Sequence, residues 1–198
     1  MSERLQYGVF GEDDSDFEML KVLIRRLAGD DRLTVGGRGY SGKGELLKSC
    51  ARDLRELRRR GFHRFVIAQD ADTDDLRQIE VTRQRYLRTI VEPSGIEKSC
   101  CVVLPVQAIE AWILADVDSI AGRFRMKPEP IHEPERLARP KDILVRLSRD
   151  DRGVKHYHPV LHNKIVAQGL DLDRVADRCP SFRPLREFVH GDRHHRSA

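Results

Sequence analysis

Hydrophobic positions in the first 120 residues follow two patterns that alternate along the chain. Short continuous apolar runs occupy residues 5–10, 64–69 and 100–106, and a weaker run occupies residues 33–35. Continuous apolar runs of this length are typical of strands that are buried on both faces. In the last run, Cys100 and Cys101 are neighbours, so we expect their side chains to lie on opposite faces of the sheet.

Between these runs, apolar residues recur three or four positions apart, which predicts amphipathic helices. The first is expected to begin at Ser15, with Glu18 completing a capping box, and to end near Gly29. A second is predicted over residues 45–60, and a third follows the strand at residues 64–69. Strands and helices in alternation predict an α/β fold with a mostly parallel open sheet and helices on both faces, as in Rossmann-like proteins.

The pattern changes beyond residue 120. Residues 126–140 are rich in proline and are expected to form an ordered linker, with Pro140 as the first residue of a helix. Further short helices are predicted over residues 163–168, 173–178 and 183–189, and the tail at 191–198 is expected to be disordered. We therefore expect an α/β domain over residues 1–120 and, over residues 121–198, a linker and small helical extension that packs on it.

Charge adds a possible partner. The chain has 36 Lys and Arg residues against 32 Asp and Glu, a net charge of +4, and clusters such as Arg58, Arg59 and Arg60 could neutralise phosphates. Solvated helix faces account for such clusters as well. The charge pattern permits nucleic acid, DNA or RNA, as a partner and does not require it.

The composition also bears on location. No apolar stretch approaches the ~20 residues of a membrane-spanning helix, and the first residues lack the basic and apolar regions of a secretory signal. The four cysteines form no CxxC pair, which argues against a zinc site or a disulfide framework. We expect a cytoplasmic protein with free thiols and no membrane segment.

Acidic residues gather directly after two predicted strands. Because the carboxyl ends of parallel strands meet at one edge of a sheet, we expect the two groups to lie close together. Carboxylates so placed repel one another unless a cation lies between them, and Mg²⁺ or Mn²⁺ is the natural candidate. The alternative is that these acids only cap the helices that follow. The first group is Glu12, Asp13, Asp14 and Asp16, and the second is Asp70, Asp72, Asp74 and Asp75.

Two acids of the predicted helix at 109–116 could likewise be metal ligands or helix caps. Glu110 lies near the start of this helix and could join the acidic group as a second metal ligand. A favourable charge at a helix N-terminus explains it equally well. Asp116 is expected to cap the segment that follows.

A glycine-rich loop at residues 37–44 matches the first seven positions of a P-loop. Gly44 stands where a P-loop has the Ser or Thr that holds magnesium, so we reject an ATPase reading. The loop could still offer backbone N–H groups and Lys43 to a phosphate, with Gly42 and Gly44 as its phosphate-binding glycines. A plain flexible connection is equally consistent.

Two resemblances follow from these motifs. Gly11-Glu12 after a first strand, with Asp70-Ala71-Asp72 after a later one, resembles the Toprim domain of topoisomerases, primases and overcoming-lysogenisation-type nucleases. The resemblance implies that Glu12 acts as general acid or base and that Asp70 and Asp72 bind magnesium.

A second resemblance spans nearly the whole chain. It rests on residues 42–44, 110–116, 140–141 and 179–182, which are similar to a family of small, uncharacterised prokaryotic Toprim-like proteins. Members of that family are often considered defence-associated and sometimes work with a partner ATPase. The resemblance favours Lys141 as a residue that stabilises charge on the phosphate.

These observations lead to a hypothesis and two rivals. The hypothesis is a magnesium-dependent nuclease, with Glu12 and Lys141 as catalytic residues and Asp70, Asp72, Asp74 and Glu110 as metal ligands. One rival is a non-catalytic nucleic-acid-binding or regulatory subunit that works with an ATPase. A weaker rival is a small-molecule phosphotransferase or nucleotide-binding protein. Metal binding discriminates between the hypothesis and the first rival, and a compact basic surface near residues 42–44, with no extended groove, would favour the second.

Overall fold

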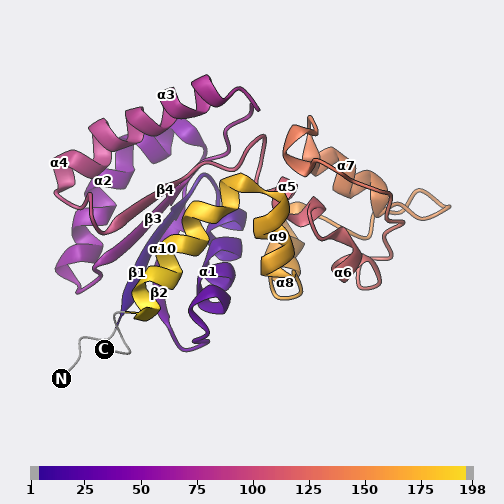
Figure 1. The fold of residues 1–198 in the computed structure, drawn as a ribbon, viewed down its shortest axis with the longest axis horizontal. Helices are drawn as coiled ribbons and strands as arrows, with labels where there is room; N and C mark the ends of the chain where they lie inside the picture. Colours follow the sequence, from indigo (N-terminus) through magenta and orange to yellow (C-terminus); the bar gives the residue numbers. More distant parts are fainter. Residues whose placement is uncertain (1–4, 195–198) are drawn as a thin grey trace.

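The computed structural model describes residues 5–194, and the side chains up to residue 191. Four strands form one parallel sheet in the order β2-β1-β3-β4 (Figure 1). The strands are β1 (Gln6–Gly11), β2 (Thr34–Gly39), β3 (Arg64–Ala68) and β4 (Cys100–Val103). The chain reverses its direction across the sheet between β1 and β3, which makes the carboxyl ends of these two strands a topological switch point.

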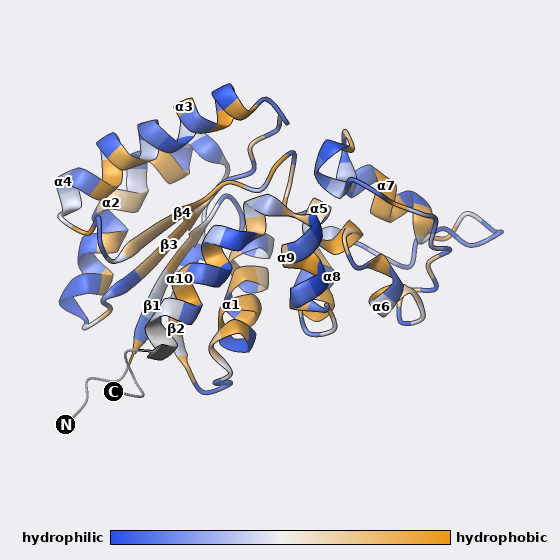
Figure 2. Ribbon diagram, in the orientation of Figure 1, coloured by the Kyte–Doolittle hydropathy of each residue, from blue (hydrophilic) through white to orange (hydrophobic). Residues whose placement is uncertain are grey.

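Helices cover both faces of the sheet, which confirms the predicted fold class. One face packs on α1 (Asp14–Ala28) and α10 (Arg183–His194), and the other on α2 (Lys43–Arg59) and α3 (Leu76–Tyr86). A π-helical turn (Leu87–Val91) and α4 (Glu92–Ser94) continue α3. Figure 2 shows apolar residues gathered on the strands and on the helix sides that meet them.

The rest of the chain forms short helices. One cluster of buried side chains runs from the sheet through α1 into these helices, so the extension shares a core with the α/β part; the division at residue 120 stays a prediction. Pro140 is the first residue of its helix, as predicted. The helices are α5 (Glu110–Leu114), α6 (Val117–Ala121), the 3₁₀ turn Pro134–Arg136, α7 (Pro140–Leu147), α8 (Pro159–Ala167), α9 (Leu172–Arg178) and the 3₁₀ turn Pro180–Phe182.

Several local predictions are wrong. Asp13, not Ser15, caps α1, because its side chain accepts a hydrogen bond from the Asp16 backbone N–H at 2.9 Å. Ser15 lies inside the helix and donates its hydroxyl to the carbonyl of Pro159. Residues 191–194 continue α10 and are not disordered, and residues 195–198 lie outside the described part of the chain.

The first part of the glycine-rich segment, residues 37–39, is the end of β2, and residues 40–42 form the connection to α2. A Cβ atom on Gly37 would lie 1.8 Å from the Val9 carbonyl oxygen, and one on Gly39 would lie 2.0 Å from the carbonyl carbon of Asp13. Glycine is therefore needed at these two positions because β2 lies against β1 and the turn that follows it.

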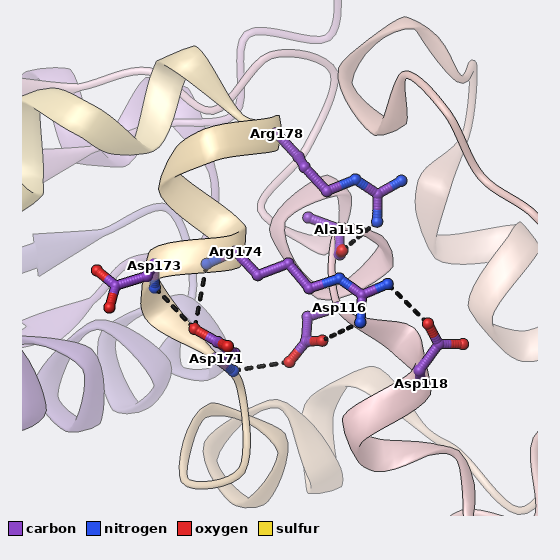
Figure 3. Close-up of polar contacts among 7 residues, drawn as sticks. All are labelled: Ala115, Asp116, Asp118, Asp171, Asp173, Arg174 and Arg178. Atoms are coloured by element: carbon purple, nitrogen blue, oxygen red, sulfur yellow. Dashed lines mark hydrogen bonds and ion pairs between the residues drawn. The ribbon is translucent and has the colours of Figure 1, made fainter.

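Asp116 does not cap the helix that follows it; it forms a buried link between distant helices. Its carboxylate, fully inaccessible to solvent, accepts hydrogen bonds from the Asp171 backbone N–H at 2.7 Å and from Arg174 at 3.1 Å (Figure 3). Arg174 also reaches Asp118, and Arg178 donates to the carbonyl of Ala115. The contacts join α9 to the segment between α5 and α6.

The cysteines agree with the predicted strand geometry. Cys100 packs on the core of one face and Cys101 on the core of the other. All four cysteines are free, and burial raises the pKa of the Cys101 thiol to about 12. Among residues 5–194, every helix falls short of the length and apolar character that crossing a bilayer requires.

Candidate functional site

A cavity of about 450 Å³ lies at the carboxyl edge of the sheet, beside the switch point between β1 and β3. Six acidic residues line it, one of them at the start of α7, and we call it the acidic cavity. Its acids are Asp13, Asp16, Asp70, Asp72, Glu110 and Asp142, and its basic residues are Arg139 and Lys141. The structure therefore brings together residues from both predicted acidic groups.

Asp16 is one of the cavity acids that were not predicted as metal ligands. It lies one helical turn before Met19 and Leu20 on the side of α1 that faces the core, and it is buried. Burial raises the pKa of its carboxyl to about 8, with the charges of Asp13 and Glu110 acting in the same direction. The sequence already shows that Asp16 lies on the apolar side of its helix, and an acid in that position indicates a buried carboxyl group.

Asp70 follows β3 directly and is held by the loop after β4. Its Oδ1 accepts a hydrogen bond from the Ile109 backbone N–H at 2.9 Å. Burial, followed by the charges of Asp16 and Glu110, raises the pKa of Asp70 well above its ordinary value. Asp16, Asp70 and Glu110 thus form one electrostatically coupled group.

Glu110 is only 4% exposed and is held from the extension. The side-chain amide of Asn163 donates from Nδ2 to Glu110 Oε1 at 3.3 Å, and the hydroxyl of Tyr157 donates to Asn163 Oδ1. Burial raises the pKa of Glu110, while the positive charge of Lys141 opposes that rise. Lys141 therefore acts on the acidic group through space from the rim of the cavity.

Glu12 lies in the turn after β1, beside the residues that line the cavity. Its Oε2 atom is buried and has no hydrogen-bond partner among the residues that the structure describes. Burial raises the pKa of Glu12, while Lys43 and a hydrogen bond from the backbone of Asp70 lower it. A buried carboxylate oxygen without a partner is an unsatisfied acceptor that a proton or a cation can satisfy.

Lys43 points at the acids. Its Nζ donates to the carbonyl oxygen of Asp70 at 2.9 Å and also to the Asp72 carboxylate. The backbone N–H of Gly42 is bonded to the carbonyl of Glu12 at 3.0 Å, and Gly44 lies in the first turn of α2. The phosphate-binding role predicted for this loop stays a prediction, and its lysine ammonium already contacts Asp70 and Asp72.

Two left-handed residues shape one wall of the cavity. Asp72 (φ 53°) and Gln107 (φ 61°) are paired through backbone hydrogen bonds, from Asp72 N–H to the Gln107 carbonyl at 2.9 Å and from Gln107 N–H to the Thr73 carbonyl at 3.1 Å. Arg139 (φ 55°) adds a third on the opposite rim. Non-glycine residues in this conformation cost free energy and cluster at functional sites.

Asp74 lies apart from the other predicted ligands. It does not line the acidic cavity and instead faces a neighbouring pocket. The chain turns at the left-handed Asp72, which redirects the residues after it. Asp13, Asp16 and Arg139 line the cavity without having been predicted as site residues.

The oxygen donors of the cavity suit a hard cation that keeps several water molecules as ligands. Within residues 5–194, no three His, Cys, Asp or Glu side chains form a group that could hold a metal ion by themselves. Magnesium is commonly bound through one or two carboxylates, with water and substrate oxygens as its other ligands. The coupled carboxylates and the unsatisfied Glu12 oxygen fit a cation held in that way.

The fold and the cavity define the protein as an α/β protein whose buried acids meet at the switch point of a parallel sheet. The chain belongs to the family described as a domain of unknown function (DUF4276), whose model matches residues 11–190. No curated protein and no solved structure matches the chain.

Proposed function

We propose that this protein is a magnesium-dependent, nuclease-like hydrolase of nucleic-acid phosphodiesters. The observation that carries the proposal is the coupled group Asp16, Asp70 and Glu110, buried together with raised pKa values. Burying three acids beside one another destabilises the fold when they are charged, so we expect that their charge has a function. Binding a cation is such a function.

Asp70, with Asp16 or Glu110, would hold Mg²⁺ or Mn²⁺. The ion would polarise a phosphate oxygen and lower the pKa of a bound water. Asp72 is the weaker ligand of those predicted from sequence, because it is 69% exposed and paired with Lys43. Asp74 is not part of the proposed set, because it faces another pocket.

The other groups around the cavity have roles in moving protons and holding phosphate. Glu12 would transfer the proton, since burial brings its pKa upward from the ordinary range of a carboxyl group. Lys141 and Arg139, on the rim, would contact the phosphate oxygens and stabilise charge that develops there. Phosphate contacts of this kind position a backbone without reading its sequence.

The resemblance of Glu12 and of Asp70-Ala71-Asp72 to the Toprim pattern supports the same chemistry. Together with the Arg and Lys clusters of the sequence, it also supports DNA or RNA as substrate. A role in defence and an ATPase partner rest on the second resemblance, carried by residues 42–44, 110–116, 140–141 and 179–182, and a cytoplasmic location rests on the composition and the cysteines.

A specific observation favours the rival of a non-catalytic nucleic-acid-binding subunit. Lys43 already contacts the Asp70 carbonyl and the Asp72 carboxylate, and Lys141 faces Glu110, so lysine ammonium groups partly offset the acids. In that rival the charges serve stability and the cavity binds no divalent ion. Metal binding therefore separates the two functions.

The test is calorimetric titration of Mg²⁺ and Mn²⁺ into the wild type, Asp70→Asn and Asp16→Asn, with cleavage assays on plasmid, single-stranded DNA and RNA. Asparagine keeps the size of the side chain and a hydrogen-bond acceptor. Asp31→Asn, in an exposed turn, is the matched control. We expect binding and cleavage in the wild type and control, and loss of both in the two site variants. A wild type that binds neither ion, with and without nucleic acid, would exclude the proposed enzyme.

A further inference from the structure

A second pocket lies next to the acidic cavity and has a different chemical character. Its volume is about 480 Å³, within the range typical of small-molecule sites. Its wall is mainly apolar, and four charged residues, Asp74, Arg83, Glu135 and Arg136, also line it. We call it the apolar pocket; its apolar residues are Leu76, Ile79, Leu104, Val106, Pro180 and Pro184.

The two hollows share one thin wall. Asp72 and Gln107 line the acidic cavity, whereas Asp74 and Val106 line the apolar pocket. In each of the two loop segments that form the wall, the residue facing one hollow is thus only one or two positions from the residue facing the other. The backbone bonds between Asp72, Thr73 and Gln107 hold the wall together, so the two hollows keep a fixed relation.

Glu135 provides a fixed polar group inside the apolar pocket. Its Oε1 accepts hydrogen bonds from the backbone N–H of Ser181 at 3.1 Å and from the Ser181 hydroxyl. Within the described part of the chain both bonds end on Oε1, which leaves Oε2 for a ligand. Ser181 also accepts a hydrogen bond from the indole N–H of Trp112 at 2.9 Å, so Glu135 is connected to the tryptophan.

We propose, on the basis of the proposed function, that the apolar pocket receives one unstacked nucleobase of a single-stranded nucleic acid whose phosphodiester lies in the acidic cavity. A base has two apolar faces and a polar edge, which matches apolar walls with one fixed acceptor. Guanine matches best, because its N1–H and its exocyclic amino group are adjacent donors on the Watson–Crick edge that can both point at the free Oε2 of Glu135. Bases paired and stacked in a duplex cannot enter such a pocket without being extruded.

Trp112 makes the proposal testable without any catalytic assay. It is the only tryptophan of the chain and is bonded through Ser181 to Glu135, so its fluorescence reports on the apolar pocket. Guanosine, which has no phosphate, is titrated into the metal-free protein and followed by fluorescence and calorimetry. We expect saturable binding, with adenosine and uridine binding more weakly.

The matched variants are Pro184→Phe, which fills the pocket from a half-buried position, and Leu161→Phe, which adds similar bulk at an exposed position on α8. Pro184→Phe is expected to weaken guanosine binding at least ~10-fold, since it occupies the volume that the base needs. Leu161→Phe is expected to leave it unchanged. Both variants should keep the magnesium affinity of the wild type.

The outcomes separate this inference from the proposed function. Guanosine that produces neither heat nor a fluorescence change, or that binds Pro184→Phe as it binds the wild type, overturns the apolar pocket as a base site even if magnesium binds. Guanosine binding that is lost in Pro184→Phe supports the base site even if the wild type binds no metal. Where the protein is active, cleavage of duplex DNA as fast as single strands also contradicts the inference.

Discussion

Asn163 of α8 donates a hydrogen bond from Nδ2 to Oε1 of Glu110, 53 residues earlier in the chain. The bond is buried, and the Tyr157 hydroxyl, bonded to the other end of the same amide, determines its orientation. The extension therefore holds one of the three coupled acids in position. Residues of this kind affect metal affinity without touching the metal.

Asn163→Leu is predicted to weaken magnesium binding by about 10–100-fold, the range typical of residues that orient a ligand. Removing the amide also leaves Glu110 and Tyr157 without their partner, so the pKa of Glu110 should rise further. Calorimetry with Mg²⁺ measures the affinity. Tyr157→Phe, which removes only the orienting hydroxyl, should have a smaller effect, and unchanged affinity in Asn163→Leu would refute a positioning role.

Gly39→Ala is predicted to disturb the acidic cavity through the backbone. Its Cβ would meet the backbone of Asp13 and Asp14 at 2.0–2.2 Å, so the turn that carries Glu12 and Asp16 has to move. We expect a lower melting temperature and weaker magnesium binding.

Gly44→Ala is the matched control for this glycine. Nothing lies within 4 Å of the Cβ position on Gly44, which is in the first turn of α2. Alanine there should leave metal binding intact and change stability by roughly +0.5 to +1 kcal/mol through helix propensity. Equal effects of the two substitutions would contradict the argument from close packing.

The stability of the metal-free protein is predicted to fall as the pH rises from about 4 to about 8. The pKa of Asp16 is about 8 in the fold against 3.8 for an ordinary aspartate, so between these values the folded state binds more protons than the unfolded state. The stability that Asp16 contributes is fully present below the pKa that its carboxyl has in the unfolded chain. It is lost as the pH rises through the higher pKa that the carboxyl has in the folded protein. Asp70 and Glu110 act in the same direction.

Urea unfolding at pH 5 and pH 8 measures this effect. Asp16→Asn should show a smaller difference between the two pH values than the wild type, because its side chain does not titrate. Mg²⁺ added at pH 8 should restore stability in the wild type, since a ligand that binds only the folded state stabilises it. A wild type that is more stable at pH 8 than at pH 5 without metal would be inconsistent with the burial of these acids.

Arg174→Met is predicted to destabilise the fold by about 2–3 kcal/mol. Among the described residues, it leaves the fully buried Asp116 carboxylate with only the backbone N–H of Asp171 as its hydrogen-bond partner. Arg186→Met is the control, because its partner Asp173 is exposed and exposed pairs contribute at most about 1 kcal/mol. Urea unfolding of both variants measures the two losses of stability. If Arg174→Met lowers the free energy of unfolding no more than Arg186→Met does, the structural role of the buried ion pair is contradicted.

Local periodicity was sufficient to predict the parallel sheet and the helices on both faces. It left open whether Glu110 joins the acids after the strands, and it was not sufficient where the outcome depends on distant partners. Asp116 looked like a helix cap because its partner Arg174 lies 58 residues away. Asp74 lines a different pocket from Asp70, and the left-handed turn at Asp72 before it cannot be inferred from an alternation of acids.

The cap of α1 was misassigned for a similar reason. Ser15 and Glu18 match a capping box, but β2 packs its Gly39 against Asp13 and Asp14, and the cap lies two residues earlier, at Asp13. Tertiary packing thus overrode a local signal.

The bond from Ser15 to the carbonyl of Pro159 spans 144 residues, and that from Asn163 to Glu110 spans 53. These contacts make the acidic cavity a late product of synthesis. A chain still emerging from the ribosome can pair its four strands once residue 103 is free, yet α8 cannot reach Ser15 and Glu110 until Asn163 has followed. Whatever chemistry the acids perform, the growing chain can acquire it only after all the residues of its four strands have been synthesised.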